Sequence, residues 1–493
     1  MIKFIYSHEY LSYDMRYVRR RDFLIVGKFL GTIMQATGLI VLLPIIVAII
    51  YNEGHYLSFV FPSLLSIATG TLIRTILKGY PTSGDIIKLK HGMMIASFGW
   101  AWATIIGALI LMLYLNIDFV NATFENMSGW TTTGLSIFSD VQSLPKSILF
   151  LRSLEQWIGG LGVIVVVIGV LIRPGTAASR LYKSEARDER IKPSIVNTVK
   201  TIWWIYITYA IIGITLYYMS GMPIFDAVNH TFSALSTGGF SIKNDNIGYY
   251  HNNLIYIISM LLMTIGGTNF IVHYQLLKGN MKNALKDVQL QLAITFIIFF
   301  SILIIYLGRL APMEGIFHVV SSLSTTGFNI TPTKGMISWP PFVKIILIAC
   351  MMIGMATGST GGGIKLLRII TIIKGVYWEI IRILAPEGSV IPREISGKSI
   401  GDEEIKEASS YINLYFVFMF ISWAILLLYG YEPLDSLFEV ASAQGNVGLS
   451  MGITSATLPA IPKIALIFNM WIGRLEIIPI LVLVRGIIEA FKR

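Results

Sequence analysis

The chain has 493 residues, of which 54% are hydrophobic and only 13% carry a charge. Soluble proteins carry about 25% charged residues, and a chain with half that share could not cover its apolar surface in water. The composition therefore excludes a soluble enzyme, a disordered protein and a disulfide-stapled secreted protein. It predicts a protein embedded in a lipid bilayer.

The net charge of +10 follows from 38 basic and 28 acidic residues. Many of the basic residues gather in alternate connectors between apolar runs, at 16–21, 74–90, 173–200 and 278–286. This alternation follows the positive-inside rule, which explains the charge without a nucleic-acid partner. We therefore expect no nucleic-acid binding, and we expect both termini on the cytoplasmic side.

The chain contains a single cysteine, Cys350, and seven scattered histidines. A lone cysteine forms no disulfide within the chain and supplies no metal-ligand pair, and the histidines lack a zinc-binding spacing. We expect no covalently bound cofactor, and we expect the histidines to be structural or interfacial.

Apolar runs of about 20 residues, the length of a membrane-spanning helix, recur ten times along the chain. They lie near residues 23–50, 56–77, 93–115, 146–172, 201–220, 252–277, 288–310, 342–384, 411–430 and 461–488. The eighth run is too long for one helix, and five glycines between 354 and 363 interrupt it. The sequence therefore predicts an all-α, multi-pass membrane protein with about ten transmembrane helices.

Four connectors on the outer side each begin with a short amphiphilic segment, which is too short to cross a bilayer. Each segment leads into a loop with a central glycine, a bulky apolar residue and then Ser or Asn. We number these Gly-centred loops 1 to 4; they cover residues 131–136, 236–241, 324–329 and 445–450. The glycine of an Ile-Gly pair follows each central glycine by 25–27 residues. These offsets predict a fourfold repeat of span, short helix, loop and span.

The repeat divides the chain into five predicted parts. An N-terminal tail with two additional spans covers 1–92, repeat 1 covers 93–195, repeat 2 covers 196–285, repeat 3 with a broken helix covers 286–405, and repeat 4 covers 406–493. We expect the four repeats to surround a single cation pore with pseudo-symmetry.

The chemistry of the loops points to a cation. Irregular backbone at membrane depth is tolerated only where it lines a water-filled cavity or is buried in protein. Four such loops around one axis would present main-chain oxygens that replace the water shell of a cation, and the negative C-terminal end of each short helix would stabilise it. The predicted filter and ion site comprises Thr132, Thr133, Gly134, Thr237, Gly238, Gly239, Thr325, Thr326, Gly327, Asn446, Val447 and Gly448. The competing interpretation is that these loops only pack between helices, as small residues often do in membranes.

Arg474 breaks the fourfold pattern, because the other repeats carry Gly or Met at its position. An arginine at the bilayer centre costs roughly 2.5–3.5 kcal/mol on insertion scales and usually faces a cavity or a partner. We predict that Arg474 projects into the pathway below the filter as an electrostatic constriction. The alternative is a structural ion pair with Glu476 or Glu155. We also expect Arg152 and Glu155, three residues apart on a helix, to pair.

The glycine-rich stretch inside the eighth run cannot continue as a stable helix, because repeated glycine disfavours helix. We predict a flexible gate or constriction there, below the filter, formed by Gly358, Ser359, Thr360, Gly361, Gly362 and Gly363. A phosphate-binding loop is the competing interpretation. It fails because no Gly-Lys-Ser/Thr follows and the segment lies within the membrane.

These motifs resemble those of the TrkH/KtrB family of potassium-translocating subunits, within the superfamily of K⁺ transporters. The matching stretches are MSGWTTTGLS, QWIGGLG, FSALSTGGFS, VVSSLSTTGFN, ATGSTGGGIKLLRI, SLFEVASAQGNVGL and WIGRLEI. They extend over about residues 20–490, and the two additional N-terminal spans resemble the TrkH branch.

The resemblance implies four channel-like repeats that form one K⁺ pore per subunit, in a homodimer in the cell membrane of a prokaryote. It also implies a cytosolic partner, a TrkA-like ring of nucleotide-binding regulatory subunits that controls the gate. In related plant transporters a serine at the first filter glycine accompanies sodium permeation. The four central glycines here favour potassium, although loops 2 and 4 lack the Thr-Thr pair.

The sequence therefore predicts potassium uptake through a gated, channel-like pore selective for monovalent cations, with K⁺ as the transported ion. A membrane potential supplies about 2.3 kcal/mol per charge per 100 mV, so inward movement requires no hydrolytic site. The alternative is a symporter that couples K⁺ to Na⁺ or H⁺. We do not expect an enzyme, because the spans carry no paired aspartates and no evident Ser/His arrangement.

Overall fold

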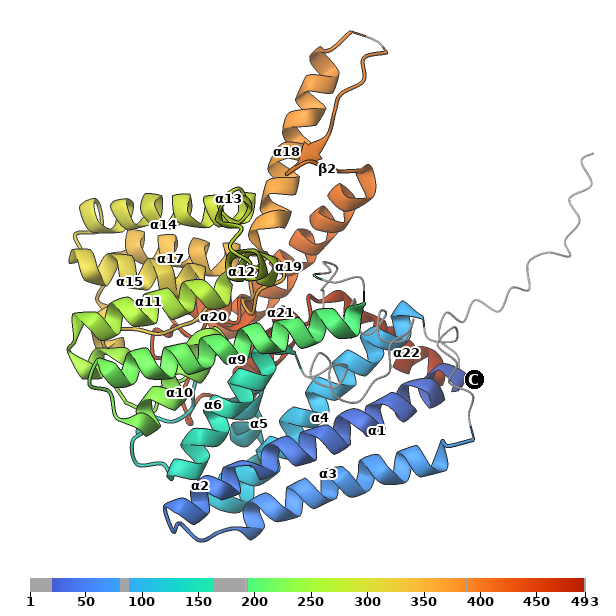
Figure 1. Ribbon diagram of the computed structural model, residues 1–493, viewed down its shortest axis with the longest axis vertical. Helices are drawn as coiled ribbons and strands as arrows, with labels where there is room; N and C mark the ends of the chain where they lie inside the picture. Colours follow the sequence, from blue (N-terminus) through green and yellow to red (C-terminus); the bar gives the residue numbers. More distant parts are fainter. Residues whose placement is uncertain (1–19, 80–87, 163–190, 192–193, 387, 492–493) are drawn as a thin grey trace, which may run out of the picture.

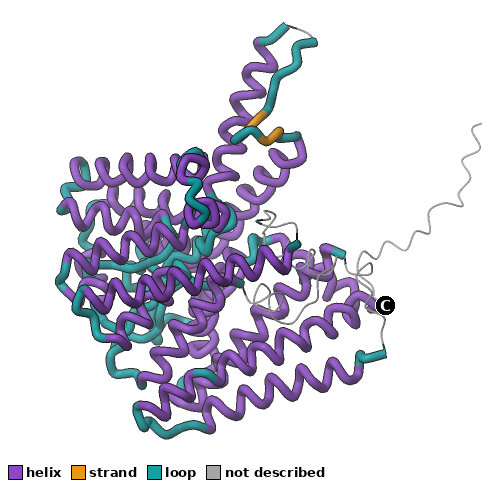
Figure 2. The backbone as a smooth tube through the Cα atoms, viewed as in Figure 1, coloured by secondary structure: helices purple, strands orange, loops and turns teal. Residues whose placement is uncertain are grey.

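The computed structural model describes residues 20–79, 88–162, 191, 194–386 and 388–491. Most of these residues are helical, and the described chain contains one pair of two-residue strands (Figure 2). The predicted all-α class is therefore confirmed. The tail before residue 20, the end of the predicted fourth span at 163–172 and the basic stretch at 173–190 lie outside the described residues.

The helices follow the predicted repeats in chain order. The N-terminal part contains α1 (Arg20–Leu42), α2 (Pro44–Ile50) and α3 (Leu57–Ile76). Repeat 1 contains α4 (Leu89–Leu115), α5 (Phe119–Trp130) and α6 (Lys146–Leu161). Repeat 2 contains α9 (Ile195–Met219), α10 (Ile224–Leu235), the 3₁₀ helix η2 (Asn246–Tyr250), α11 (Asn253–Gly267), α12 (Phe270–Leu277) and α13 (Met281–Ala284).

The second half of the chain continues the same order. Repeat 3 contains α14 (Val288–Tyr306), α15 (Pro312–Leu323), α16 (Thr333–Ile337), α17 (Pro341–Ile353), α18 (Leu366–Leu384) and the antiparallel strands β1 (Glu394–Ile395) and β2 (Lys398–Ser399). Repeat 4 contains α19 (Asp402–Leu428), α20 (Pro433–Gln444), α21 (Ala460–Arg474) and α22 (Ile478–Phe491).

The repeats share a unit of a long helix, a short helix of 12 residues and a further helix. This further helix has 13–16 residues, and we call it the second long helix because the predicted span continues beyond it. These units are α4–α5–α6, α9–α10–α11, α14–α15–α17 and α19–α20–α21. The second long helix of each unit packs against the short helix of the next: α6 on α10, α11 on α15, α17 on α20 and α21 on α5. Because the fourth contact returns to the first repeat, the four units form a closed ring.

The N-terminal helices α1 and α3 pack against each other and against α4, at the edge of the molecule (Figure 1). Glu53, in the loop after α2, connects the N-terminal helices to the beginning of α6 in repeat 1. Its carboxylate accepts hydrogen bonds from the backbone N–H groups of Lys146, at 2.5 Å, and Ser147, at 3.1 Å. A carboxylate at the beginning of a helix also interacts favourably with the helix dipole.

Three of the second long helices are broken beyond their Ile-Gly pairs. The chain bends by 108° between α11 and α12 and by 112° between α21 and α22. In repeat 3 the chain leaves the helix at residues 354–365, which we call the broken segment. Gly354, Gly358 and Gly363 have positive φ there, a conformation that an α-helix cannot contain. The break that the glycines predict is therefore present.

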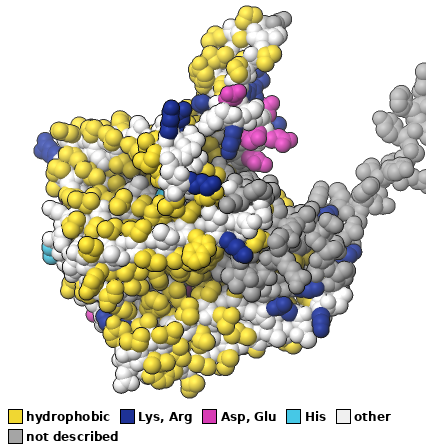
Figure 3. Space-filling view, in the orientation of Figure 1, with side chains coloured by type: hydrophobic (Ala, Val, Ile, Leu, Met, Phe, Trp, Pro, Cys, Tyr) yellow, Lys and Arg dark blue, Asp and Glu magenta, His cyan; other side chains and the backbone are white. Residues whose placement is uncertain are grey.

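By length and hydropathy, six of the described helices could cross a membrane, or up to eight if each bent pair counts as one span. The helices α6 and α17 fall short because they contain 16 and 13 residues. The number of ten crossings therefore stays a prediction. Hydrophobic side chains are spread widely over the part of the helical body that is visible in Figure 3, as expected of a surface that faces lipid.

Candidate functional site

Each short helix ends four residues before the central glycine of its loop. All four loops then begin with the same hydrogen bond, from the residue before the central glycine to the carbonyl five residues earlier. The pairs are Thr133–Ser128, Gly238–Ser233, Thr326–Ser321 and Val447–Ser442, at 2.8–2.9 Å. The four loops therefore leave their helices in the same way, although their sequences differ.

The backbone of each loop alternates in hand. The residue two before the central glycine has a φ of 51–57° in all four loops, at Thr132, Thr237, Thr325 and Asn446. The central glycines have φ of 77–104°, while the residue between does not have positive φ in any of these loops. Alternation lets successive peptide groups face the same side of the chain. A left-handed Thr or Asn costs on the order of 1–3 kcal/mol, and this cost recurs at the same position in all four loops.

The central glycines bring the loops into contact. A Cβ atom built on each central glycine would collide with a carbonyl oxygen of the next loop, at a distance of 1.9–2.3 Å. The distances are 2.3 Å from Gly134 to Gly238 O, 2.0 Å from Gly239 to Thr326 O, 1.9 Å from Gly327 to Val447 O and 2.3 Å from Gly448 to Thr133 O. The contacts run from loop 1 through loops 2, 3 and 4 and back to loop 1. One main-chain oxygen from each repeat therefore lies in a closed ring, and only glycine fits at the four contacts.

All twelve residues predicted for the filter lie in this ring of loops, buried or half-buried. The hydroxyl of Thr132 is buried without a hydrogen-bond partner. In the part of the chain that the structure describes, no group of three or more His, Cys, Asp or Glu could hold a metal ion. The atoms with which the ring could coordinate a cation are therefore main-chain and hydroxyl oxygens, which suit hard cations.

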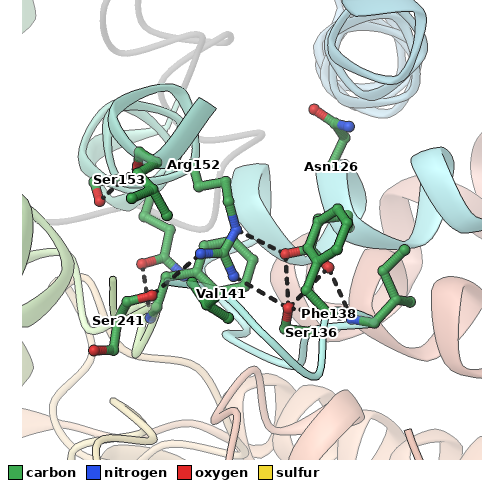
Figure 4. A network of polar contacts seen from close by, with 12 residues as sticks. Asn126, Ser136, Phe138, Val141, Arg152, Ser153 and Ser241 are labelled. Carbon is green, nitrogen blue, oxygen red and sulfur yellow. Dashed lines mark hydrogen bonds and ion pairs between the residues drawn. The ribbon is translucent and has the colours of Figure 1, made fainter. Parts of the chain in front are cut away.

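Arg152, on α6, links loops 1 and 2 (Figure 4). Its Nε donates to the Glu125 carboxylate at 2.8 Å, and Nη2 donates to Ser136 Oγ at 3.2 Å. Its Nη1 donates to the carbonyl oxygen of Ser241, in loop 2, at 3.2 Å. A fork of five N–H donors allows a single arginine to hold three partners at once.

The expected pair between Arg152 and Glu155 is wrong. Arg152 forms its ion pair with Glu125, from the neighbouring short helix α5. Glu155 is buried, and its Oε1 atom has no hydrogen-bond partner. Spacing along one helix could not reveal this outcome, because the closer carboxylate comes from another element.

A second fourfold position lies nine residues before each central glycine. It carries Glu125, His230, His318 and Glu439, all of them buried. Three of these bind the Ser that follows the central glycine by two residues: Ser136 donates to Glu125 at 3.0 Å, Ser241 pairs with His230 at 2.9 Å, and Ser450 donates to Glu439 at 2.9 Å. Sequence reasoning missed this set, although its constant offset from the glycines could have revealed it.

Two of the four short helices, α5 and α20, begin with an acidic cap at the end away from the ring. Asp118 accepts hydrogen bonds from the backbone of Val120 and Asn121, both at 3.0 Å, and these bonds lower the pKa of its carboxyl group. Glu432 accepts a hydrogen bond from the backbone of Asp435 at 2.7 Å. Each cap supports the orientation that directs the negative helix end toward the loops.

The broken segment lies against the ring. Thr360 Oγ1 donates to the carbonyl oxygen of Leu235, at the end of α10, at 3.1 Å. The backbone N–H of Gly362 donates to Thr325 Oγ1, in loop 3, at 2.8 Å. A Cβ built on Gly362 would lie 2.3 Å from the carbonyl oxygen of Gly445, in loop 4. The segment predicted as a gate therefore contacts three of the four repeats.

Arg474 connects the broken segment to repeat 1. Its Nη1 donates to the carbonyl oxygen of Thr360 at 2.6 Å. Its Nη2 donates to the carbonyl oxygens of Gly159 and Gly160, at 2.6 and 2.8 Å, at the end of α6. The guanidinium also lies 5.7 Å from the centre of the Trp100 ring. The positive charge thus lies among carbonyl oxygens at the base of the ring.

Glu476 occupies the elbow between α21 and α22, with a φ of 59°. Its carboxylate pairs with Lys365 at 3.1 Å and with Arg368 of α18. Lys365 also has positive φ, 75°, so two strained residues face each other across this ion pair. Beside them lies a cavity of about 30 Å³, lined by the broken segment, Trp100 and Arg474. It has room for about two water molecules.

Comparison with known proteins identifies this arrangement. The TrkH family, described as cation transport protein, matches residues 66–309 and 305–490. The chain belongs to the TrkH family. The predicted resemblance is therefore confirmed.

The relatives match more than nine tenths of the chain. An uncharacterized cation transporter of Methanocaldococcus jannaschii is 40% identical over 94% of this chain and 96% of its own. The Trk system potassium uptake protein TrkG of Escherichia coli is 31% identical over 94% and 98%, and TrkH of Salmonella typhimurium is 29% identical over 93% and 97%. The crystal structure of the potassium transporter TrkH from Vibrio parahaemolyticus matches with a TM-score of 0.80 at 26% identity, over 94% of this chain and 98% of that one. The chain is thus a multi-pass membrane protein of a cation transport family.

Proposed function

We propose that this protein takes up potassium through a gated, channel-like pore in the cell membrane of a prokaryote. The observation that carries the proposal is the closed ring of Gly-centred loops, with one main-chain oxygen from each repeat at the contacts. The names of its relatives support the choice of ion, since TrkG and TrkH are potassium uptake proteins that match over more than 90% of both chains.

In this proposal K⁺ leaves its water shell at the ring and binds oxygens of the twelve filter residues. The alternating backbone hand and the shared exit from the short helices support equivalent roles for the four loops. The C-terminal ends of the four helices face the loops and favour a cation over an anion.

The proposed gate is the broken segment from Gly358 to Gly363 together with Arg474. The contacts of Arg474 support this role, because the segment cannot move away from Arg474 without breaking the bond to Thr360 O, while the bonds to Gly159 O and Gly160 O hold Arg474 to α6. A disulfide between Gly361→Cys and Thr325→Cys tests it, since a Cβ at position 361 would lie 3.1 Å from Thr325 Oγ1. Oxidation should hold the ion flux low and reduction should restore it; a flux that ignores the redox state in the double variant refutes the gate. Because Thr325 also belongs to the predicted filter, the fluxes of the double variant are compared with those of the single variant Thr325→Cys, which must not respond to the redox state.

We extend the proposal to a homodimer with a cytosolic, TrkA-like nucleotide-binding regulatory partner. The hairpin of α18 and α19, which projects beyond the rest of the molecule, supports a further contact (Figure 1). One face of α18 exposes apolar side chains, namely Ile373, Val376, Tyr377, Ile380 and Leu384. The mass of the detergent-solubilised protein, with and without the partner, tests both assemblies.

The deciding experiment is rescue of a potassium-uptake-deficient strain on low K⁺, with Rb⁺ and Na⁺ fluxes compared. Growth with Rb⁺ flux above Na⁺ flux is expected; absence of K⁺-dependent rescue by protein present in the membrane refutes the proposal. Reversal potentials, measured while each ion is varied separately, test the mechanism. An uncoupled pore follows K⁺ alone, whereas a symporter also responds to Na⁺ or H⁺.

A further inference from the structure

Loop 2 departs from the other loops at one position. The residue before the central glycine is Gly238 in loop 2, whereas loops 1, 3 and 4 carry Thr133, Thr326 and Val447. The side chain that would occupy this place in loop 2 is missing, and yet the loop is as buried as the others.

The amide of Gln156, on α6, fills that place. A Cβ built on Gly238 would lie 2.4 Å from Gln156 Cδ and 2.5 Å from its Oε1. The amide also forms two hydrogen bonds with loop 2, one on each side of the central Gly239. Its Nε2 donates to the carbonyl oxygen of Gly238 at 2.5 Å, and its Oε1 accepts from the backbone N–H of Phe240 at 3.1 Å. The side chain of Gln156 is fully buried, so water cannot replace these bonds at low cost.

The internal repeat shows that the two departures belong together. Gln156 stands three residues before the glycine of its Ile-Gly pair, and the same position in repeats 2, 3 and 4 carries methionine. These methionines, Met263, Met351 and Met470, are fully buried. Each second long helix packs against the short helix of the next repeat. By position in the repeat, the equivalents of Gln156 with Gly238 are therefore Met263 with Thr326, Met351 with Val447 and Met470 with Thr133. Three pairs combine methionine with a side chain, and the fourth combines glutamine with glycine.

The hydrogen bond from Gln156 has an electrostatic consequence. Gly238 O is one of the four main-chain oxygens at the contacts of the ring. Since Gln156 already donates a hydrogen to it, this oxygen presents a weaker field to a cation than an oxygen without a donor. The four loops therefore share one backbone geometry, but the field that their oxygens present to a cation is not equal in all four.

We propose that Gln156 is a positioning residue that determines ion specificity through loop 2. It holds Gly238 and Phe240 in place of a side chain and reduces the field of one ring oxygen. This inference rests on the proposed function, because it assumes that the ring oxygens bind the ion.

The test is a swap that gives repeat 2 the pairing of repeat 3. The variant Gly238→Thr alone should lower K⁺ uptake at least about tenfold, because its side chain collides with Gln156. The variant Gln156→Met alone should lower the ratio of K⁺ to Na⁺ flux by about tenfold, since two buried backbone groups lose their partners. The double variant should recover uptake relative to Gly238→Thr, with an altered K⁺ concentration for half-maximal flux.

Two controls separate this inference from a loss of folding and from the proposed function. Gln291→Met, an exposed glutamine on α14, should leave all fluxes unchanged, and the amount of each variant in the membrane is measured in parallel. If the unmodified protein carries no K⁺, the proposed function fails. If it carries K⁺ but the double variant is no better than Gly238→Thr, or Gln156→Met keeps the flux ratio, the role of Gln156 is refuted.

Discussion

The ring of loops and the helix ends beyond the Ile-Gly pairs differ in how well they keep the fourfold repeat. In the ring, all four loops repeat the same backbone angles, the same hydrogen bond and the same glycine contact. Beyond the Ile-Gly pairs, α11 and α21 continue through bends of 108° and 112°, whereas α17 gives way to the broken segment. The geometry of the ring depends on the backbone, whereas the geometry of the helix ends depends on individual charged side chains such as Arg474 and Glu476.

This difference has a physical origin. A ring of main-chain oxygens requires equal geometry from each contributor, and glycine with left-handed neighbours supplies it whatever the other side chains are. The proposed gate has the opposite requirement, because four identical elements would have to move together. An asymmetric region allows one segment, here 354–365, to change its contacts alone. The comparison yields four predictions.

The largest effect is expected from the variant Gly327→Ala. The new Cβ would lie 1.9 Å from Val447 O at a φ of 85°, so the contact between loops 3 and 4 must open. We expect K⁺ uptake to fall by about 100-fold or more, because one oxygen leaves the ring. Rb⁺ uptake by cells measures it. The control Gly79→Ala adds a methyl group where nothing lies within 4 Å; near-normal uptake by Gly327→Ala would show that the ring does not determine transport.

The next effect concerns the asymmetric region. The variant Arg474→Ala removes a positive charge and three hydrogen bonds to carbonyl oxygens at the base of the ring. We expect cation flux to rise by about tenfold and to lose its regulation, since a cation then meets no like charge in a region of low dielectric constant. Electrical recording in proteoliposomes measures the flux.

Arg485→Ala provides the matched control for Arg474→Ala. Arg485 is an arginine on the adjacent helix α22, more than half exposed, and it pairs with Glu489 at 2.6 Å. Its removal should leave the flux unchanged. A flux through Arg474→Ala equal to that of the unmodified protein would reduce Arg474 to a structural role.

The sequence predicted the regions that depend on backbone and repetition. The apolar runs gave the helical class, the fourfold offsets located the loops, and the glycines between 354 and 363 located the helix break. Contacts between repeats could not be predicted in the same way. Arg152 binds Glu125 of a different helix, and Gln156 binds loop 2, which lies 82 residues away in the sequence. Such partners depend on which helix packs on which short helix, and a single sequence does not contain that information.

A smaller effect is expected at the elbow of repeat 4. The variant Glu476→Gln removes the charge that pairs with Lys365 and Arg368, and it leaves two largely buried cations without their anion. We expect the free energy of unfolding to fall by about 2 kcal/mol, below the roughly 3–5 kcal/mol for breaking a fully buried pair, because Arg368 is partly exposed. We also expect the closed state to leak. The melting temperature and the basal flux measure the two effects.

Glu379→Gln is the control for Glu476→Gln. Glu379 lies on α18 and pairs with Arg382, but both side chains are about half exposed, so the pair contributes little. If both variants melt at the temperature of the unmodified protein, the pairing of Glu476 does not hold α18 to the elbow.

The smallest effect is expected at the outer loops, where Asp140 links repeats 1 and 2. Its Oδ1 accepts a hydrogen bond from Asn244 Nδ2 at 2.9 Å, and this bond lowers the pKa of the Asp140 carboxyl group. A carboxyl whose pKa is lower in the folded state stabilises the fold above its unfolded pKa of about 3.9. That contribution disappears as the pH falls through the folded pKa. The variant Asp140→Asn should therefore melt slightly below the unmodified protein at neutral pH, and the two melting temperatures should converge once the pH falls below the folded pKa of Asp140. The exposed neighbour Asp245→Asn serves as the control. A difference that persists in acid would show that packing, rather than the charge of Asp140, joins the two loops.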